Sequence, residues 1–225
     1  MTRRWQLGFG VVLTMLAGFI DALGFIRLGG FYTSFMSGNT TQFAVALGRG
    51  DLFHAVLPAV LIVAFLTGAV TGGALAALTP TRWVTPAVLA FETVAVTAAL
   101  VTAIEDVHIG TASLFLALAM GGQNAVLAHV QGFRAGTTFI TGALFSFGQK
   151  AALALAGRAP RMGWFGDAAV WIALLIGAVA GTLTHAHLGA AALAIPACVA
   201  GGLCLGACLV VLSARPGSGQ APSRF

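Results

Sequence analysis

Long apolar runs dominate the chain, and short polar stretches separate them. They lie near residues 7–29, 52–78, 83–104, 110–130, 165–187 and 190–212. A helix needs about 20 apolar residues to cross a bilayer, so each run predicts one membrane-spanning helix. Two weaker runs, near 31–48 and 136–156, contain glycine, threonine and amide residues, which indicates broken or re-entrant segments. The pattern predicts an all-α polytopic membrane protein with about six full spans and two broken or re-entrant segments.

The distribution of basic residues favours six crossings. With six, both termini and most arginines lie in the cytoplasm, as the positive-inside rule requires. If both weak segments cross, Arg82 and Arg134 move outside, and Glu105 moves inside. The charge asymmetry is then poorer. Seven or eight crossings is therefore the alternative.

Polar interruptions recur in the chain at an interval of a little over 100 residues. Gly18 and Asp21 are followed by Ser37–Thr41, and the stretch Gly121–Asn124 is followed by Thr141-Gly142. Paired breaks of this kind are typical of the internal repeats of transporters. The pattern predicts an internal duplication.

The predicted repeat units are 7–104 and 110–212, within a single transmembrane domain of residues 1–212. An odd number of crossings in each unit makes the two units inverted, whereas they are parallel if the broken segments cross as well. Residues 213–225 are polar and predict a disordered cytoplasmic tail.

The composition supports a membrane protein. Charged residues make up only 8% of the chain and hydrophobic residues 59%, whereas soluble domains contain about 25% charged residues. The net charge of +5 does not indicate a nucleic-acid partner, because the basic residues lie at the ends of apolar runs. The predicted partners are the lipid bilayer and a small-molecule substrate. Small-residue stripes such as Gly68–Gly72 also allow a homodimer, although packing within one chain explains them equally well.

Two acidic residues lie near the middle of predicted spans. A carboxylate at the bilayer centre costs about 2.5–3.5 kcal/mol on insertion scales, so Asp21 and Glu92 must face the protein interior or a cavity. Both are candidates for proton or cation coupling. Asp21 is equally suited to anchoring the free N–H groups of the broken segment. Lys150 either pairs with Glu92 or extends to the lipid headgroups.

The strongest local motif is Ser37-Gly38-Asn39-Thr40-Thr41, where glycine permits a break and the polar side chains offer oxygen atoms. The start of a helix at this break also attracts anions. The predicted substrate-binding residues are Asp21, Ser37, Gly38, Asn39, Thr40, Thr41, Gln123, Asn124, Thr141 and Gly142. The alternatives are simple capping for the first motif and hydrogen bonding between helices for the amide pair.

No sequence feature indicates an enzyme, a cofactor or a metal site. Phosphate-binding loops, dinucleotide fingerprints and zinc-protease motifs are all missing from the sequence. Cys204 and Cys208 are expected to be small apolar filler, and His185 and His187 are spaced so that they do not share a helix face.

The chain resembles the YoaK family in two sequence elements, Gly18-Phe19-Ile20-Asp21-Ala22 and Met36-Ser37-Gly38-Asn39-Thr40. The resemblance covers almost the whole chain. The resemblance implies a small multi-pass protein of the bacterial inner membrane. It brings no substrate and no catalytic residues. The sequence therefore favours a small-molecule secondary transporter or exporter with a site near the bilayer midplane. The alternatives are a channel or pore, and a non-transporting membrane scaffold or sensor.

Overall fold

The computed structural model describes residues 3–105, 109–131 and 140–213, and these residues form α-helices joined by loops and short 3-10 turns. The elements are α1 (Arg3–Arg27), α2 (Met36–Gly48), α3 (Leu52–Leu78), η1 (Thr81–Trp83), α4 (Val84–Ile104), α5 (Ile109–Gln131), α6 (Ile140–Leu155), α7 (Phe165–Leu188), η2 (Gly189–Leu193) and α8 (Ala194–Ser213). The all-α prediction is confirmed for the described residues. The predicted tail beyond Ser213 lies outside them.

Four stretches of the described residues are long and apolar enough to cross a membrane. They are Leu7–Arg27, Leu52–Leu78, Thr81–Ile104 and Phe165–Ser213. The last one is 49 residues long and contains both α7 and α8, which meet at the turn η2.

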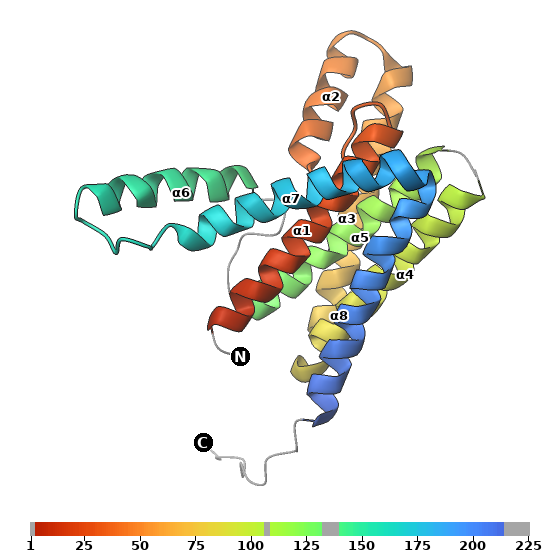
Figure 1. Ribbon diagram of the computed structural model, residues 1–225. Helices are drawn as coiled ribbons and strands as arrows, with labels where there is room; N and C mark the ends of the chain where they lie inside the picture. The colour runs from red at the N-terminus through yellow and green to blue at the C-terminus, as the bar shows by residue number, and fades with distance from the viewer. Residues whose placement is uncertain (1–2, 106–108, 132–139, 214–225) are drawn as a thin grey trace, which may run out of the picture.

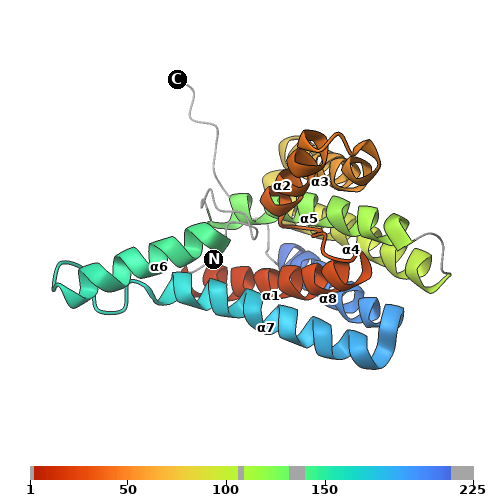
Figure 2. The same cartoon turned by 90° about the horizontal axis from the view of Figure 1, so that it is seen from above.

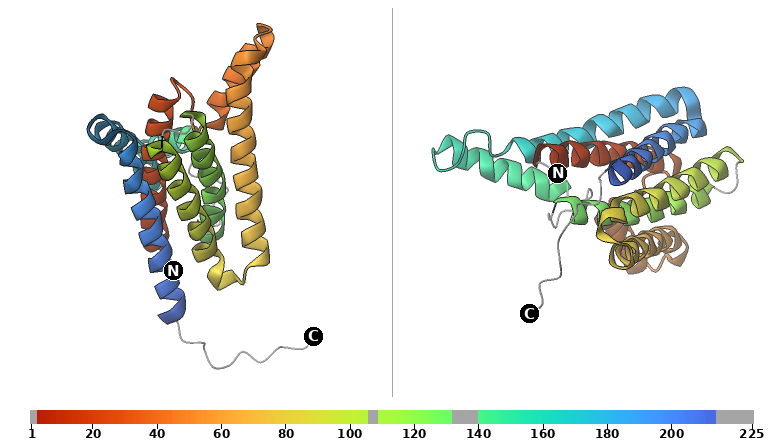
Figure 3. Two further views of the ribbon diagram at one scale, coloured as in Figure 1. Left: turned by 90° about the vertical axis from the view of Figure 1, so that its right-hand side faces the viewer. Right: turned by 90° about the horizontal axis from the view of Figure 1, so that it is seen from below.

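The helices pack as a bundle in which α1 lies beside α7, and α5 lies between α3 and α4 (Figures 1 and 2). Helix α4 also packs against α8 (Figure 3). Each of the two short helices packs on the helix that follows it, α2 on α3 and α6 on α7. In Figure 1, α6 and the first turns of α7 extend to the left of the other helices.

Glycines bring α1 and α7 into backbone contact. A Cβ atom built on Gly177 would lie 2.0 Å from the carbonyl oxygen of Met15, and one on Gly18 would lie 2.2 Å from that of Leu174. No side chain fits at such distances. These two helices can therefore approach as closely as they do only because both positions are glycine.

The pair α3 and α5 meets in the same way. A Cβ on Gly68 would lie 1.9 Å from the carbonyl oxygen of Leu118, and one on Gly121 would lie 2.0 Å from that of Phe65. The small-residue stripe around Gly68 therefore packs two helices of one chain together, as one of the two sequence interpretations proposed.

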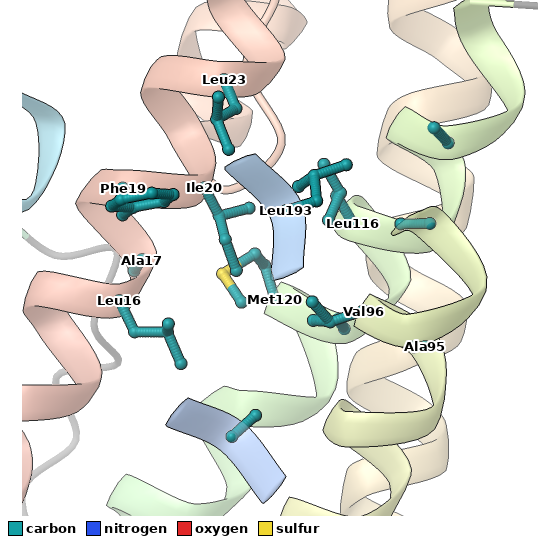
Figure 4. Packing of buried hydrophobic residues seen from close by; sticks show 14 of the residues in the cluster. Leu16, Ala17, Phe19, Ile20, Leu23, Ala95, Val96, Leu116, Met120 and Leu193 are labelled. Atoms are coloured by element: carbon teal, nitrogen blue, oxygen red, sulfur yellow. The ribbon is translucent and has the colours of Figure 1, made fainter. Parts of the chain in front are cut away.

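The core has two buried apolar clusters at different heights of the bundle. The first joins α1, α4, α5, η2 and α8 around Ile20, Val96, Met120 and Leu193 (Figure 4). The second lies around Leu13, Leu89 and Val126. Along α1 the second cluster precedes the first, whereas along α5 it follows the first. The two helices therefore run in opposite directions.

The outer surface is apolar. Large hydrophobic side chains on α3 are mostly exposed, among them Phe53 (84%) and Val70 (64%), and Leu209 on α8 is 66% exposed. Burial of apolar surface is strongly favourable, so such faces need a nonpolar surrounding such as lipid.

Candidate functional site

Asp21 on α1 binds the loop that connects α1 to α2. Its Oδ1 accepts hydrogen bonds from the backbone N–H of Thr33 at 2.9 Å and of Ser34 at 2.7 Å. The hydroxyl of Thr33 donates to Oδ1 at 2.9 Å, and the hydroxyl of Ser34 donates to Oδ2. Thr33 and Ser34 are buried. The carboxylate therefore serves as the acceptor that two otherwise unpaired N–H groups need.

This arrangement turns the loop back towards the middle of α1. Asp21 lies six residues before the last residue of α1, and the loop residue Thr33 lies six residues after it. The loop must therefore run back beside the last turns of α1. Gly29 and Gly30 make the reversal, with φ angles of 64° and 113° that other residues rarely adopt. Helix α2 then begins at the level of Asp21, deeper in the protein than the end of α1.

Asn39 fastens the same loop to α2. Its side-chain amide donates to the carbonyl oxygen of Tyr32 at 2.7 Å, and the N–H of Tyr32 donates to its Oδ1 at 3.1 Å. Gln42 on the next turn donates to the carbonyl oxygen of Gly30 at 3.0 Å. The side chain of Asn39 is fully buried. We define Asp21, Tyr32, Thr33, Ser34 and Asn39 as the loop anchor.

The other predicted residues of the first motif face outwards or pack locally. The hydroxyl of Thr40 donates to the carbonyl oxygen of Met36, and that of Thr41 to Ser37, each one turn earlier in α2, and both threonines are exposed. Gly38 packs against the ring of Phe35, where a Cβ would lie 2.7 Å from a ring carbon.

A second polar cluster lies in the bundle core. Nε2 of Gln123 on α5 donates to Oε1 of Glu92 on α4 at 2.9 Å and to the carbonyl oxygen of Leu13 on α1 at 3.4 Å. Both side chains are fully buried. Within the described residues, Oε2 of Glu92 has no hydrogen-bond partner. We define Glu92 and Gln123 as the core pair.

The remaining predicted residues lie outside both clusters. The side-chain amide of Asn124 donates to the carbonyl oxygen of Met120 in its own helix. Thr141 and Gly142 are exposed at the start of α6. Thr137 and Thr138, two further hydroxyl residues shortly before Thr141 in the sequence, lie outside the described residues.

Lys150 does not pair with Glu92. Its Nζ lies 2.7 Å from Oδ2 of Asp167, which joins α6 to α7. The idea of a Lys150–Glu92 pair is therefore wrong. It failed because spacing along the sequence does not reveal which carboxylate packs beside α6.

The loop anchor and the core pair are separate along α1. Leu13, which the core pair contacts, precedes Asp21 by eight residues, or about 12 Å of helix axis. The sequence interpretation missed Tyr32, Thr33 and Ser34. The signal was available, because the hydroxyl residues Thr33 and Ser34 stand shortly before the predicted polar motif Ser37–Thr41.

No group of three or more His, Cys, Asp and Glu side chains that could bind a metal ion occurs in the part of the chain that the structure describes. Cys204 makes a weak hydrogen bond to the carbonyl oxygen of Pro86 at 3.6 Å, which joins α8 to α4. It therefore contributes to helix packing.

Comparison with known proteins identifies a family. The family described as "Protein of unknown function (DUF1275)" matches residues 9–206, so the chain belongs to this family. A UPF0700 transmembrane protein of Rhizobium meliloti (strain 1021) is 49% identical over 51 residues, which cover 22% of each chain. The match thus spans about a fifth of that relative. No solved structure matches the chain. The chain has several long apolar helices and is similar to a transmembrane protein, so it is a multi-pass membrane protein.

Proposed function

We propose that this member of the DUF1275 family is a secondary transporter or exporter of a small molecule. The chain crosses a bacterial inner membrane six times, with both termini in the cytoplasm, and is of the YoaK type. Its substrate binds near the midplane, between the two broken segments. Asp21 and Glu92 are the candidates for coupling transport to protons or cations. The observation that carries the proposal is a fully buried carboxylate, Glu92, in the core of the bundle, one oxygen of which has no hydrogen-bond partner among the described residues.

Helix lengths support six crossings. At about 1.5 Å per residue, α2 with 13 residues and α6 with 16 are about 20 and 24 Å long, less than a hydrocarbon core of about 30 Å. The 49-residue stretch that contains α7 and α8 turns at η2 and is long enough to cross twice. With α1, α3, α4 and α5, this makes six.

The glycine contacts support an internal repeat. Gly68 contacts Leu118, and Gly177 contacts Met15. The two glycines are 109 positions apart, and the two residues that they contact are 103 positions apart. The second contact repeats both intervals, because Gly121 follows Gly18 by 103 positions and Leu174 follows Phe65 by 109. Helix α1 thus meets α7 as α5 meets α3. Such reciprocal contacts are expected of two equivalent units.

The opposite directions of α1 and α5 support an inverted repeat. Helices α4 and α8, which hold the same place in the two units, also run in opposite directions. On α4, Val84 in the second cluster precedes Ala99 in the first cluster. On α8 the order is reversed, because Ala200 in the first cluster precedes Leu203 in the second. Inverted repeats with broken helices at their interface are the common plan of secondary transporters.

The polar lining of the proposed site comes from both units. Asp21 and Asn39 form the wall of the first unit, with Ser37, Gly38, Thr40 and Thr41 around the start of α2. Gln123, Asn124, Thr141 and Gly142 belong to the second unit. Since Asp21 and Asn39 bind their own loop, substrate contact requires a conformation in which the loop anchor opens, as alternating access demands.

The test starts from the substrate. Metabolites that differ between a deletion strain and its parent provide candidates, and uptake into proteoliposomes is then measured with and without a pH gradient. Glu92→Gln should abolish acceleration by the gradient. Thr67→Ala, which removes an exposed hydroxyl on α3 that bonds only to its own helix, should leave uptake unchanged. Normal gradient-driven uptake by folded Glu92→Gln and Asp21→Asn proteins would overturn the coupling role.

A non-transporting scaffold or sensor is the second candidate. The hydrogen bonds of Asn39 and Asp21 to their own loop favour it, because both residues then serve only to hold the fold. In that case, substitution of Asn39 or Gln123 lowers the yield of folded protein and no flux is detected. A channel or pore differs from both in giving flux that opposing gradients do not alter.

A further inference from the structure

We infer that the coupling ion is a proton and that Glu92 is the residue that binds it, an inference that rests on the proposed transport function. The geometry that points to this is the core pair, in which Oε1 of Glu92 accepts from an amide donor and Oε2 has no hydrogen-bond partner in the part of the chain that the structure describes.

The surroundings of Glu92 disfavour a lasting negative charge. Val88, Leu89 and Val96, which share a face of α4 with Glu92, are apolar and fully buried. The ion pairs in the part of the chain that the structure describes join His54 to Asp51 and Lys150 to Asp167, so Glu92 has no cationic partner there. A buried carboxylate without a cation is costly, and binding a proton removes that cost.

The titratable groups on neighbouring helices do not replace a cation. On α1, Asp21 is bound by the loop and Arg27 lies at the far end of the helix. On α8, the thiol of Cys204 faces the carbonyl oxygen of Pro86, one turn or more from Glu92 along α4. The remaining described titratable groups on the helices that pack against α4 are Cys198 and Cys208 on α8, and Asp51 and His54 at the start of α3. Arg82 and Glu105 flank α4 itself.

The donor set disfavours a metal cation at the same place. Hard cations such as Mg²⁺ and Ca²⁺ bind through six or so oxygen ligands. The group that faces Glu92 is instead the NH₂ end of Gln123, because Nε2 donates to Oε1 of Glu92 and to the carbonyl oxygen of Leu13, and both of these atoms are acceptors. An N–H donor repels a cation, whereas a proton needs only one free oxygen, and Oε2 provides it.

Asp21 is less suited to the same task. Both of its carboxylate oxygens already accept hydrogen bonds from Thr33 and Ser34. A proton on Asp21 competes with these four donors for the carboxylate, whereas a proton on Oε2 of Glu92 competes with no donor among the described residues. In each transport cycle, Glu92 takes one proton from water on one side of the membrane and returns it to water on the other.

The test needs no substrate. Infrared spectra of the full chain in proteoliposomes, recorded over a pH series in H₂O and D₂O, report the C=O stretch of protonated carboxyl groups. We expect a band that disappears as the pH rises, is missing in Glu92→Gln and is retained in Asp21→Asn. Replacing KCl by NaCl at constant pH should leave it unchanged. A titrating band that persists in Glu92→Gln, no titrating band in the wild type, or a band that Na⁺ removes would each overturn the inference.

Gln123→Met is the second variant, in case Glu92→Gln fails to fold. It keeps the carboxyl group and removes its amide donor, so the band should persist and move in frequency, because the C=O stretch responds to hydrogen bonding. A band at an unchanged frequency would contradict the role of the core pair. The outcomes also separate the two proposals. A Glu92 band that titrates without any substrate flux refutes transport only, whereas flux driven by Na⁺ with no titrating band refutes the proton only.

Discussion

Asn39 binds both backbone groups of Tyr32, with its amide donating to the carbonyl oxygen at 2.7 Å and its Oδ1 accepting from the N–H at 3.1 Å. This pair of hydrogen bonds joins the loop between α1 and α2 to the first turn of α2. An asparagine is needed because it offers one donor and one acceptor at the end of a short side chain.

Asn39→Ala should therefore destabilise the protein. It leaves two backbone groups of Tyr32 without their partner, and each such group costs about 1–3 kcal/mol when buried. We expect a clear fall in the midpoint of thermal unfolding in detergent. Thr41→Ala on the exposed face of the same helix is the matched control and should change the stability by less than about 0.5 kcal/mol. Equal effects of the two variants would contradict the role of Asn39.

Substitutions of Asp21 should separate its charge from its hydrogen bonds. Asp21→Ala removes the acceptor for two N–H groups and two hydroxyls, whereas Asp21→Asn keeps one oxygen for the two N–H groups. We expect the alanine variant to lose more stability than the asparagine variant, by about 1–3 kcal/mol.

The measurement is thermal unfolding with protease digestion between residues 28 and 35 as a local readout. Faster cleavage in Asp21→Ala than in Asp21→Asn is the expected order. Ser37→Ala, an exposed neighbour, serves as the control. If both Asp21 variants are cleaved as slowly as the wild type, the carboxylate does not hold the loop.

Glycine substitutions should distinguish close helix contacts from open positions. In Gly68→Ala and Gly177→Ala the new Cβ would lie 1.9 and 2.0 Å from a backbone oxygen, so the helices must separate. Overpacking of this kind costs about 1–3 kcal/mol or more. We expect a lower yield of monodisperse protein in size-exclusion chromatography.

Gly73→Ala provides the control for this series. Gly73 lies on α3 beside Gly72, and a Cβ there meets no atom within 4 Å. Because alanine favours a helix over glycine by about 1 kcal/mol, stability should be unchanged or slightly higher. A yield of Gly68→Ala equal to that of Gly73→Ala would mean that α3 and α5 do not approach as described.

The sequence predicted the helices well because apolar run lengths are set by the thickness of the bilayer. The run at 52–78 coincides with α3, and the run at 83–104 with α4. The weak segment near 31–48 was predicted only as broken or re-entrant, and the structure shows residues 31–35 as a loop before α2. Their apolar pattern suits a helix, but Asp21 from α1 takes the N–H groups of Thr33 and Ser34. A contact between residues 12 positions apart is invisible to local periodicity.

The core pair shows the same limit. Glu92 and Gln123 each stood out as polar groups in an apolar run. The sequence does not reveal, however, that α4 and α5 face each other at these two positions. The proposed partner Lys150 carried the right charge but belongs to α6, which packs on α7. Burial of a polar residue can therefore be predicted, whereas its partner depends on the topology of the helices.

The start of α3 should respond to acid. The backbone N–H of His54, followed by its imidazole, holds the pKa of Asp51 below its usual value. The ionised side chain caps α3 and is 41% exposed. Because the folded state favours the ionised form, this stabilisation is present above the unfolded pKa of about 3.9 and is lost as the pH falls through the lower folded-state pKa.

Hydrogen exchange of the amides of residues 52–56, relative to unstructured peptides at each pH, measures this effect. Protection should fall below about pH 4. In Asp51→Asn, which keeps a cap without a titrating group, protection should not change over the same range. A fall of equal size in both proteins would assign the transition to another group.

Topology mapping tests the number of crossings. Reporter fusions after residues 50, 82, 105 and 160 sample the connections that follow α2, η1, α4 and α6. With six crossings, positions 50 and 105 lie outside, and 82 and 160 lie in the cytoplasm. With eight, positions 50, 82 and 105 change sides while 160 does not, so 160 is the internal control. The short α2, whose N-terminal side is tied back to Asp21 in α1, makes an external position 50 the expected result. A cytoplasmic position 50 would mean that α2 continues across the membrane and that the two repeat units are parallel.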